Sequence, residues 1–401
     1  MISSGRANLP LHPGKVPKWL YQRMEKIGLA ITELILDEYG TAGFISRISN
    51  PYWFQALGCV MGMDWHSSGI TTSVLGSLKH AINSNSRSLG LHVCGGRGSH
   101  SRKTPDELIA ISNIFGFDPD SLVTASRLSA KVDNNCLGDG YQLYLHSFII
   151  DKDKNWAVVQ QGMNGKERMA RRYHWHSETV HSFVDEPHEA IIGESSGKIL
   201  NLTDHRSEDS RDAIVDFLNQ HPDRQVKELE ALGFPVTRNL QLELFMPERH
   251  EVKAKDVDAG RLGALLATAY ERHPENLSES LLIPGVGPRT VQSLALVSEV
   301  VYGKPNRFSD PARFSFAHGG KDGHPFPVPL KTYDESIHTL QKAIEAAKIG
   351  QQEKVESFKR LHRFALEVEE HLDPIADVEA VIAHERSISK SLGGRTCSRS
   401  E

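Results

Sequence analysis

The chain has 401 residues, of which 39% are hydrophobic and 24% are charged. This length exceeds the usual size of a single core, so two or three domains are expected, and the composition supports cores that need no metal or disulfide. The net charge of -5 excludes a protein that is basic throughout. Any contact with nucleic acid must therefore be local.

The cysteines and the apolar runs indicate where in the cell the protein is located. Cys59, Cys94, Cys136 and Cys397 show no CxxC spacing, and no signal peptide precedes them. No apolar run approaches the roughly 18 residues that a membrane span requires. We therefore expect a soluble, cytoplasmic protein with reduced thiols and no membrane partner.

Helical and strand patterns alternate from about residue 28 to residue 190, which is typical of an α/β domain. Apolar residues at helical spacing predict a helix over 70–84, with Ser67 or Ser68 before it as a cap. "LGLHV" (89–93) predicts a buried strand, which the glycine-rich loop "CGGRGSHSRK" (94–103) follows. Thr104 and Pro105 then begin the next helix.

A hairpin is predicted over "YLHSFIIDKDKNWAVVQQGMN" (144–164), with its turn at 151–155. A strand period of two places Tyr144, His146, Phe148 and Ile150 on one face. His146 should then lie opposite Gln160. Two roles for His146 stay open: a ligand for a bound anion, or a strand histidine that simply hydrogen-bonds a neighbour.

The later part of the chain reads as helical. Helices are predicted within 204–231 and over 258–273 and 291–303, with one or two long amphipathic helices over 333–372. The long helices suit a bundle or a dimer interface. The tail from about Ser387 is predicted to be disordered.

The hairpin resembles the phospholipase D superfamily motif, HxKxxxxD followed by a GSxN-like turn. The resemblance implies a mixed sheet flanked by helices, and His146 as a nucleophile that attacks phosphorus. It also implies that Asn164 binds phosphoryl oxygens, that Asp151 orients a histidine, and that His174, or His146 of a second subunit, protonates the leaving oxygen. A single motif copy implies a homodimer. This mechanism requires no cofactor.

The chain departs from that motif where the motif has its lysine. Phe148 stands in the lysine position, and Gln161 and Gly162 replace the Gly-Ser pair. Other cations must then meet the charge of the phosphoryl group. Two basic loops supply them: Arg97, Arg102 and Lys103 in one, and Lys166, Arg168, Arg171 and Arg172 in the other. Taken singly, each loop is better explained as a solvated basic segment.

A divalent metal (Mn or Mg) is the alternative route to phosphodiester hydrolysis. His174 and His176 are two residues apart on one strand, a spacing that metals use. The further ligand candidates are Glu178, Asp185, Glu186 and His188, and more weakly Asp64 and His66. The competing interpretation is an ordinary polar strand.

"LLIPGVGPRT" (281–290) is the most specific pattern in the chain. A helix that ends near Pro284, a turn of small residues and a helix that begins at Pro288 would direct backbone amides at one anion. It resembles the helix-hairpin-helix motif, which grips DNA phosphates without reading sequence. The residues that would contact phosphate are Gly285, Val286, Gly287, Arg289 and Thr290. A glycine-rich connection between helices is the plain alternative.

Base-excision glycosylases carry the same hairpin, followed by a catalytic aspartate. Asp310 stands in a similar place here, so a DNA glycosylase-like enzyme remains a minor alternative. Glycosylase-lyases have a lysine where this chain has Arg289, which disfavours a Schiff base.

Strings such as "GMDWHSSGITT", "DGYQLYLHSF", "RRYHWHSE" and "PGVGPRT" together resemble an uncharacterised bacterial and archaeal family, domain of unknown function 763. A nuclease role is what this resemblance leads us to expect.

The domain organisation follows from these resemblances. We expect a phospholipase D-like α/β domain at 1–200, a helical linker region at 201–255, an all-α helix-hairpin-helix domain at 256–330, long C-terminal helices at 331–386 and a disordered tail at 387–401. The expected function is a DNA nuclease for repair or processing, on single-stranded or branched DNA more than intact duplex. The alternative is a DNA-binding repair protein without catalysis.

Overall fold

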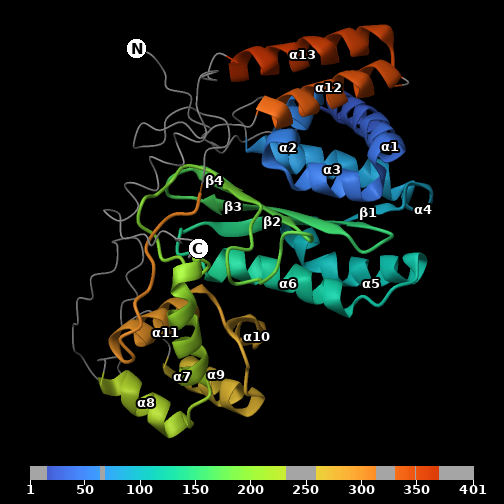
Figure 1. Ribbon diagram of the computed structural model, residues 1–401. Coiled ribbons are helices and arrows are strands. Elements are labelled where there is room, and N and C mark those ends of the chain that lie inside the picture. Colours follow the sequence, from blue (N-terminus) through green and yellow to red (C-terminus); the bar gives the residue numbers. More distant parts are fainter. Residues whose placement is uncertain (1–15, 64–67, 232–258, 313–329, 348, 370–401) are drawn as a thin grey trace, which may run out of the picture.

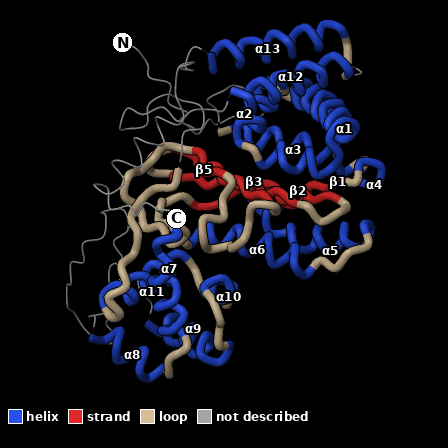
Figure 2. The backbone as a smooth tube through the Cα atoms, in the orientation of Figure 1, coloured by secondary structure: helices blue, strands red, loops and turns tan. Residues whose placement is uncertain are grey.

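In the computed structural model, residues 16–63, 68–231, 259–312, 330–347 and 349–369 are described. Within them, one sheet has the strand order β1-β2-β3-β4-β5. The strands are β1 (Leu91–Arg97), β2 (Gln142–Asp151), β3 (Trp156–Asn164), β4 (Met169–His176) and β5 (Ala190–Ile192). The strands form one layer between helices (Figure 2).

The sheet is antiparallel at each of its described pairings. The prediction of an α/β fold is confirmed, but the predicted mixed sheet is wrong. Short turns join β2 to β3 and β3 to β4, and such turns can only reverse the chain. The strand β1 also runs antiparallel to β2 because the two helices between them return the chain to the same end of the sheet.

One face of the sheet is covered by helices from both ends of the chain (Figure 1). They are α1 (Lys18–Ser49), α2 (Pro51–Val60), α3 (Gly69–Asn83), α4 (Ser86–Leu89), α12 (Leu330–Ala346) and α13 (Gln351–Glu369). The two long C-terminal helices pack on α1 and α2 of the same chain, which is one of the two arrangements that their amphipathic pattern suits. A dimer interface through them stays a prediction.

The opposite face is covered by a second set of helices, which extends away from the sheet (Figure 1). It comprises η1 (Gly98–Lys103), α5 (Thr104–Phe115), α6 (Asp120–Asn135), η2 (His205–Ser207), α7 (Glu208–Leu218), α8 (Pro222–Ala231), α9 (Ala259–Arg272), α10 (Leu277–Leu282) and α11 (Pro288–Val300). One hydrophobic cluster runs from Cys94 in the sheet to Ala312 beyond α11. The core therefore continues across residue 200, where the sequence predicts a domain boundary.

The register of the hairpin is as predicted, with His146 opposite Gln160. A bulge between Leu143 and Leu145 interrupts the alternation of faces. Tyr144 consequently packs against the α1–α3 side, whereas His146, Phe148 and Ile150 face α5 and α6. The prediction that Tyr144 shares their face is wrong, because a bulge adds one residue to the strand and exchanges the faces before it.

Several local predictions are confirmed. The helix predicted over 70–84 is α3, the helix at Thr104 is α5, and the strand within 89–93 begins at Leu91. Gly90 has a φ of 64°, so it ends α4 and starts the strand in a conformation that suits glycine. Ser68 precedes α3 without a side-chain capping hydrogen bond. Among the described helices, none is long and apolar enough to cross a membrane.

Candidate functional site

Polar side chains are buried on both faces of the sheet. On β4, Tyr173 and Trp175 join the cluster that faces α5 and α6, and Arg171 shares this face. Arg172 and His174 point the other way, where both contact the ring of Phe54 in α2. The alternation of β4 thus sends successive polar residues into two separate layers.

A chain of hydrogen bonds crosses the layer beneath α6. Ser126 Oγ lies 2.9 Å from His146 Nε2, and His146 Nδ1 lies 2.8 Å from Gln160 Oε1. Gln160 Nε2 donates to Asp133 Oδ2 at 2.5 Å, and His188 Nε2 lies 2.5 Å from Asp133 Oδ1. The chain therefore runs from α6 through two strands and back to the end of α6.

The direction of these hydrogen bonds fixes the state of His146. Because the Gln160 amide nitrogen donates to Asp133, its oxygen accepts from His146 Nδ1, and Nε2 then accepts from the Ser126 hydroxyl. Burial lowers the pKa of His146 to about 4, against the opposing effect of Gln160, so the ring is neutral near pH 7. The lone pair needed for attack on phosphorus is held by Ser126, and the residue is only 5% exposed. This geometry gives no support to His146 as a nucleophile.

Asp133 and His188 form the end of this network, and His188 is the member that reaches partial exposure. Asp133 is fully buried, and burial raises its pKa while His188 and Trp175 oppose that rise. Trp175 Nε1 and Gln160 Nε2 both donate to Oδ2, which suits an ionised carboxylate that accepts hydrogen bonds. The side chain of His188 is 7% exposed. Its hydrogen bond to Asp133 uses Nε2 and not Nδ1.

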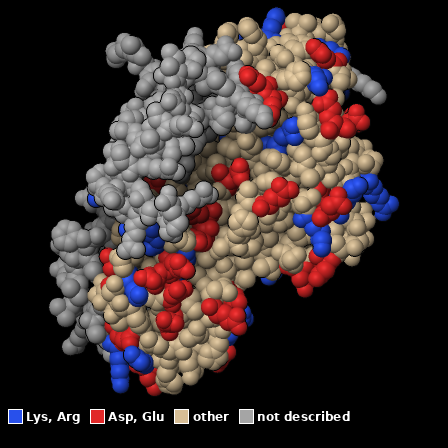
Figure 3. Space-filling view, in the orientation of Figure 1, with Lys and Arg blue, Asp and Glu red and all other residues tan. Residues whose placement is uncertain are grey.

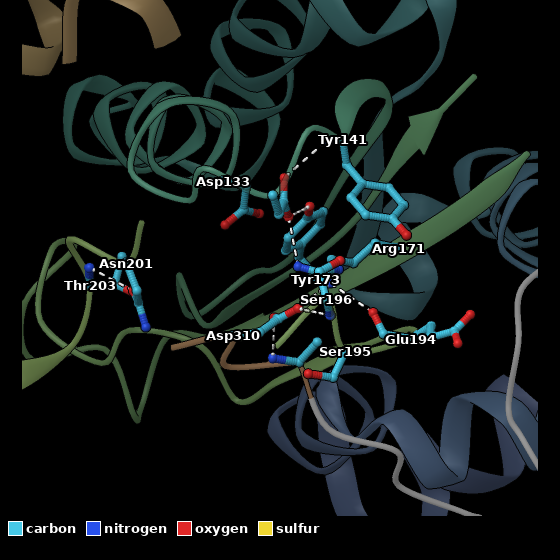
Figure 4. A network of polar contacts seen from close by, with 12 residues as sticks. Asp133, Tyr141, Arg171, Tyr173, Glu194, Ser195, Ser196, Asn201, Thr203 and Asp310 are labelled. Carbon is cyan, nitrogen blue, oxygen red and sulfur yellow. Dashed lines mark hydrogen bonds and ion pairs between the residues drawn. The ribbon is translucent and has the colours of Figure 1, made fainter. Parts of the chain in front are cut away.

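Arg171 organises a second network on the same face (Figure 4). Its guanidinium donates to Asp139 Oδ2 at 2.9 Å and to Asp310 Oδ2 at 2.7 Å. Tyr173 Oη donates to the same oxygen of Asp139 at 2.7 Å, and Ser196 N donates to Asp310 Oδ2 at 2.6 Å. This network ties β4 to the segment after α11.

The charge of Arg171 is compensated within this network, which indicates a structural role. Burial alone would lower the pKa of Arg171, but the charges of Asp139 and Asp310 raise it above the ordinary value. Both side chains of the Arg171–Asp310 pair have no exposed surface. Arg171 is therefore buried and ion-paired and does not reach DNA phosphate, although its Nε has no hydrogen bond. The Asp310 carboxylate is engaged where a glycosylase would need it available.

Arg172 lies on the opposite face with few partners. Its Nη2 donates to Gln55 Oε1 at 3.0 Å, and its Nε and Nη1 are buried without a hydrogen bond. Both ring nitrogens of His174 also lack a hydrogen bond of good geometry, although the backbone of Ile48 and Ser49 lies near enough to act on its pKa. Neither side chain has exposed surface, so neither reaches a large substrate such as duplex DNA.

The two other predicted catalytic residues are used in turns. Asp151 accepts from the amides of Asp153 and Asn155 and closes the β2–β3 turn. Asn164 accepts from the amides of Lys166 and Glu167 at the opposite end of β3. The structure therefore does not bring His146, Asp151, Asn164 and His174 to one site.

The predicted metal ligands are also separated. His188 faces α6, whereas His174 lies beneath α2, and Glu178 is exposed in the loop after β4. His176 is buried at the end of β4. No group of three or more metal-binding side chains occurs within the described ranges. Asp64 and His66 lie outside the described residues.

The two predicted basic loops differ in what they expose. Arg97, Arg102 and Lys103 are exposed at the end of β1 and in η1, as are Lys166 and Arg168 in the β3–β4 turn. Arg171 and Arg172 are buried. On the part of this face that the structure describes, basic and acidic side chains are interspersed and form no extended basic patch (Figure 3).

A cavity of about 360 Å³ lies between α1, α3 and β1. Lys79, Arg97 and Tyr21 contribute to its wall. The Lys79 ammonium already donates to both carboxylate oxygens of Glu107, at 2.9 and 2.7 Å, and to Gly95 O. Its charge is thus compensated, which leaves Arg97 as the exposed cation at this cavity.

The turn between α10 and α11 matches its predicted form. Gly285 has a φ of 93°, and Val286 is 3% exposed and anchors the turn in the core. Gly287 precedes α11 and provides no side-chain cap, and Pro288 occupies the first turn. A Cβ on Gly287 would meet nothing within 4 Å. Arg289 is exposed, and Lys131 Nζ donates to Val286 O at 2.6 Å.

A family model described as "Protein of unknown function (DUF763)" matches residues 5–328, which is most of the chain. The chain belongs to the DUF763 family. No curated protein and no solved structure matches it. Membership in DUF763 assigns no role to any residue, so the site must be judged on its geometry.

Sequence reasoning missed Asp133, around which the first network is organised. The helix α6 buries Leu122, Ser126, Ser129 and Asp133, which follow one another at helical spacing. A carboxylate on the buried stripe of an amphipathic helix needs a partner, and that pattern is the signal that could have identified Asp133.

Proposed function

We propose that this protein binds DNA through the turn 283–287 and the first turn of α11. The observation that carries this proposal is the open N-terminus of α11. Gly287 leaves the amides of Arg289 and Thr290 without a side-chain cap, and the space over Gly287 is open. Amides at a helix N-terminus bind a phosphate oxygen and stabilise its charge.

Two features of the turn support this use. The buried side chain of Val286 holds the turn in one conformation, so an anion meets amides that are already ordered. The Lys131 ammonium and the exposed Arg289 guanidinium place positive charge beside it. The resemblance to the helix-hairpin-helix motif is consistent with this geometry.

The proposed contact is to the DNA backbone, so binding should be independent of sequence and weakened by salt. A duplex-binding protein that neutralises Z phosphates shows a slope of about -0.9Z in a plot of log K against log salt. One hairpin that contacts about two phosphates then predicts a slope of about -2. Single-stranded, branched and duplex DNA are the substrates to compare.

The test uses two variants at Gly287, measured by fluorescence anisotropy with labelled DNA. Gly287→Asp places a carboxylate where the phosphate would lie, and Gly287→Asn places a neutral side chain of the same size there. Both fit the open space and cap α11, so both should fold. We expect Gly287→Asp to weaken binding at least about tenfold, and Gly287→Asn to weaken it only a few fold.

A matched control separates local charge from net charge. Ser84→Asp adds the same charge at an exposed position on the α3 side of the sheet. It should leave binding within a factor of about two. Equal affinity of wild type and Gly287→Asp would refute the proposed interface.

A second candidate function, phosphodiester hydrolysis, is favoured by the Asp133–His188 pair. In this proposal His188 Nδ1 accepts a proton from the attacking water, and Asp133 stabilises the imidazolium that forms. The buried carboxylate orients His188 from behind, and donors from Trp175 and Gln160 hold that carboxylate in place. Activation of the attacking water by a divalent metal is the alternative route in this chemistry.

Cleavage of labelled single-stranded and branched DNA tests this candidate, with EDTA, Mg²⁺ or Mn²⁺ present. We expect His188→Ala to abolish cleavage without weakening binding, and Asp133→Asn to slow it by about 10²-fold or more. His146→Ala is the comparison, because its imidazole is committed to Ser126 and Gln160. If cleavage is lost only in His146→Ala, the catalytic histidine is His146 and not His188.

A further inference from the structure

We propose that Arg172 and His174 form a buried binding site for a small oxyanion, on the face of the sheet covered by α2 and α3. The ligand class is a phosphate-sized group with several acceptor oxygens. This site lies on the face opposite to Asp133 and His188, and the inference is independent of the DNA-binding proposal.

The first argument is the uncompensated charge of Arg172. The side chain has no exposed surface, and among the described residues its hydrogen bond goes to a neutral amide, Gln55 Oε1, at 3.0 Å. Within the described ranges no carboxylate forms an ion pair with it. Burial accordingly lowers the pKa of Arg172 to about 9. A buried charge without a counter-ion is destabilising, so we expect an anion to bind beside Arg172.

The second argument is the cluster of unused polar atoms around that charge. Within the described part of the chain, Arg172 contributes two donors, Nε and Nη1, that are buried without a hydrogen bond. The ring nitrogens of His174 are buried as well and have no hydrogen bond of good geometry, with the backbone of Ile48 and Ser49 nearby. Gln161 Oε1 is also unpaired, but as an acceptor it borders the site and does not bond an anion. Gln161 holds its place through Nε2, which donates to Ser68 O at 3.1 Å. Buried polar atoms are nearly always paired, so a concentration of unpaired ones indicates a missing ligand or water.

The third argument is that these groups converge. The Arg172 guanidinium lies 4.8 Å from the centre of the Phe54 ring, and the His174 ring centre lies 5.5 Å from it. The two residues are separated by one position on β4, so their side chains leave the same face. The proximity of the Arg172 charge also lowers the pKa of His174, after burial.

An oxyanion satisfies this arrangement better than water does. Arg172 supplies two nitrogens with hydrogens to donate, and neutral His174 supplies one more N–H. An anion would compensate the guanidinium charge and favour a protonated His174, which donates from both nitrogens. Water can fill hydrogen bonds but cannot neutralise the charge. Phosphate and sulfate offer enough acceptor oxygens for these donors, whereas chloride offers one small acceptor.

The test measures the midpoint of thermal unfolding of the whole chain, after dialysis into a buffer free of oxyanions. Inorganic phosphate, sulfate, acetate and chloride are then titrated at constant ionic strength. A ligand that binds only the native state raises the midpoint with its concentration. We expect a saturable rise of several degrees with phosphate or sulfate and little with chloride.

Arg172→Met is the deciding variant, because it keeps the volume and removes the charge. Its midpoint should no longer respond to phosphate. Arg127→Met is the matched control, since Arg127 is exposed on α6, and it should respond as the wild type does. An equal response of wild type and Arg172→Met, or no response to any oxyanion, would overturn the proposal.

A direct measurement covers the case in which Arg172→Met does not fold. Equilibrium dialysis with labelled inorganic phosphate should find one saturable site per wild-type chain. His174→Leu removes an N–H donor without removing the Arg172 charge and should weaken that binding several fold. A nucleoside 5′-monophosphate, added as competitor, distinguishes the source of the phosphoryl group: displacement assigns a nucleotide, and failure to displace assigns a free oxyanion. Absence of a saturable site contradicts the proposal.

Discussion

Arg171 and Arg172 are adjacent in the sequence, equally buried, and opposite in their surroundings. Arg171 meets two carboxylates, and their charges raise its pKa. Arg172 meets one neutral amide, and burial lowers its pKa to about 9. The contrast teaches that burial alone does not define a role. A buried arginine with its counter-ions present holds the fold, and one without them indicates a ligand.

The largest expected effect is at Arg171, the arginine that forms ion pairs with two carboxylates. Arg171→Met removes the guanidinium and leaves Asp139 and Asp310 buried together without compensation. Breaking a buried ion pair in this way costs about 3 to 5 kcal/mol of the free energy of unfolding. Urea denaturation of wild type and variant measures the loss. A change below about 1 kcal/mol would contradict a structural role for Arg171.

The next effect is the response of stability to acid. The folded-state pKa of His146 is about 4, against 6.5 for the free side chain, so the unfolded chain takes up its proton first as the pH falls. This stabilisation is present above pH 6.5 and is lost as the pH falls towards 4, on the order of 3 kcal/mol. Urea denaturation at several pH values measures the slope. His146→Gln should show a shallower slope, and an unchanged slope would contradict this account.

Arg172→Met should change stability in the opposite direction to Arg171→Met. In buffer without oxyanions, the variant exchanges an unpaired buried charge for an apolar side chain. We expect the free energy of unfolding to rise by about 1 to 2 kcal/mol, which calorimetry without phosphate measures. If Arg172→Met instead destabilises the protein as strongly as Arg171→Met, the two arginines are alike and the comparison fails.

The smallest effect is expected at His146, where a substitution can leave a buried ring nitrogen without its hydrogen bond. Ser126→Ala removes the hydroxyl that donates to His146 Nε2 and leaves that nitrogen buried without a partner, as in His174. The expected loss of stability is about 1 to 2 kcal/mol. Ser129→Ala is the control, because its hydroxyl donates to the backbone oxygen of Ser126 in its own helix. Equal losses in both variants would show that the His146 hydrogen bond adds nothing.

The sequence predicted what short-range patterns specify. Helix α3, the start of α5, the β2–β3 register and the turn at 283–287 all follow from local periodicity and from glycine and proline positions. The bulge at Leu143–Leu145 was not predicted, because the pairing of two strands, rather than the spacing within one, determines it.

The candidate site was harder to predict because its contacts join distant segments. The bond between Arg171 and Asp310 spans 139 positions, and the bond between Asp133 and His188 spans 55. A pattern of residues cannot show whether Arg171 and Arg172 face solvent or the core. The polar residues of β4 are consequently divided between two layers, whereas their spacing in the sequence suggested one metal or phosphate site.

The measurement that tests the central claim most directly is amide hydrogen exchange of the protein with and without bound DNA. If the α10–α11 turn grips the phosphate backbone, DNA should slow exchange at Gly287, Arg289 and Thr290, while amides of β1 and η1 exchange as before. Protection confined to η1 and the β3–β4 turn, with the amides of 285–290 unchanged, would contradict the proposed interface.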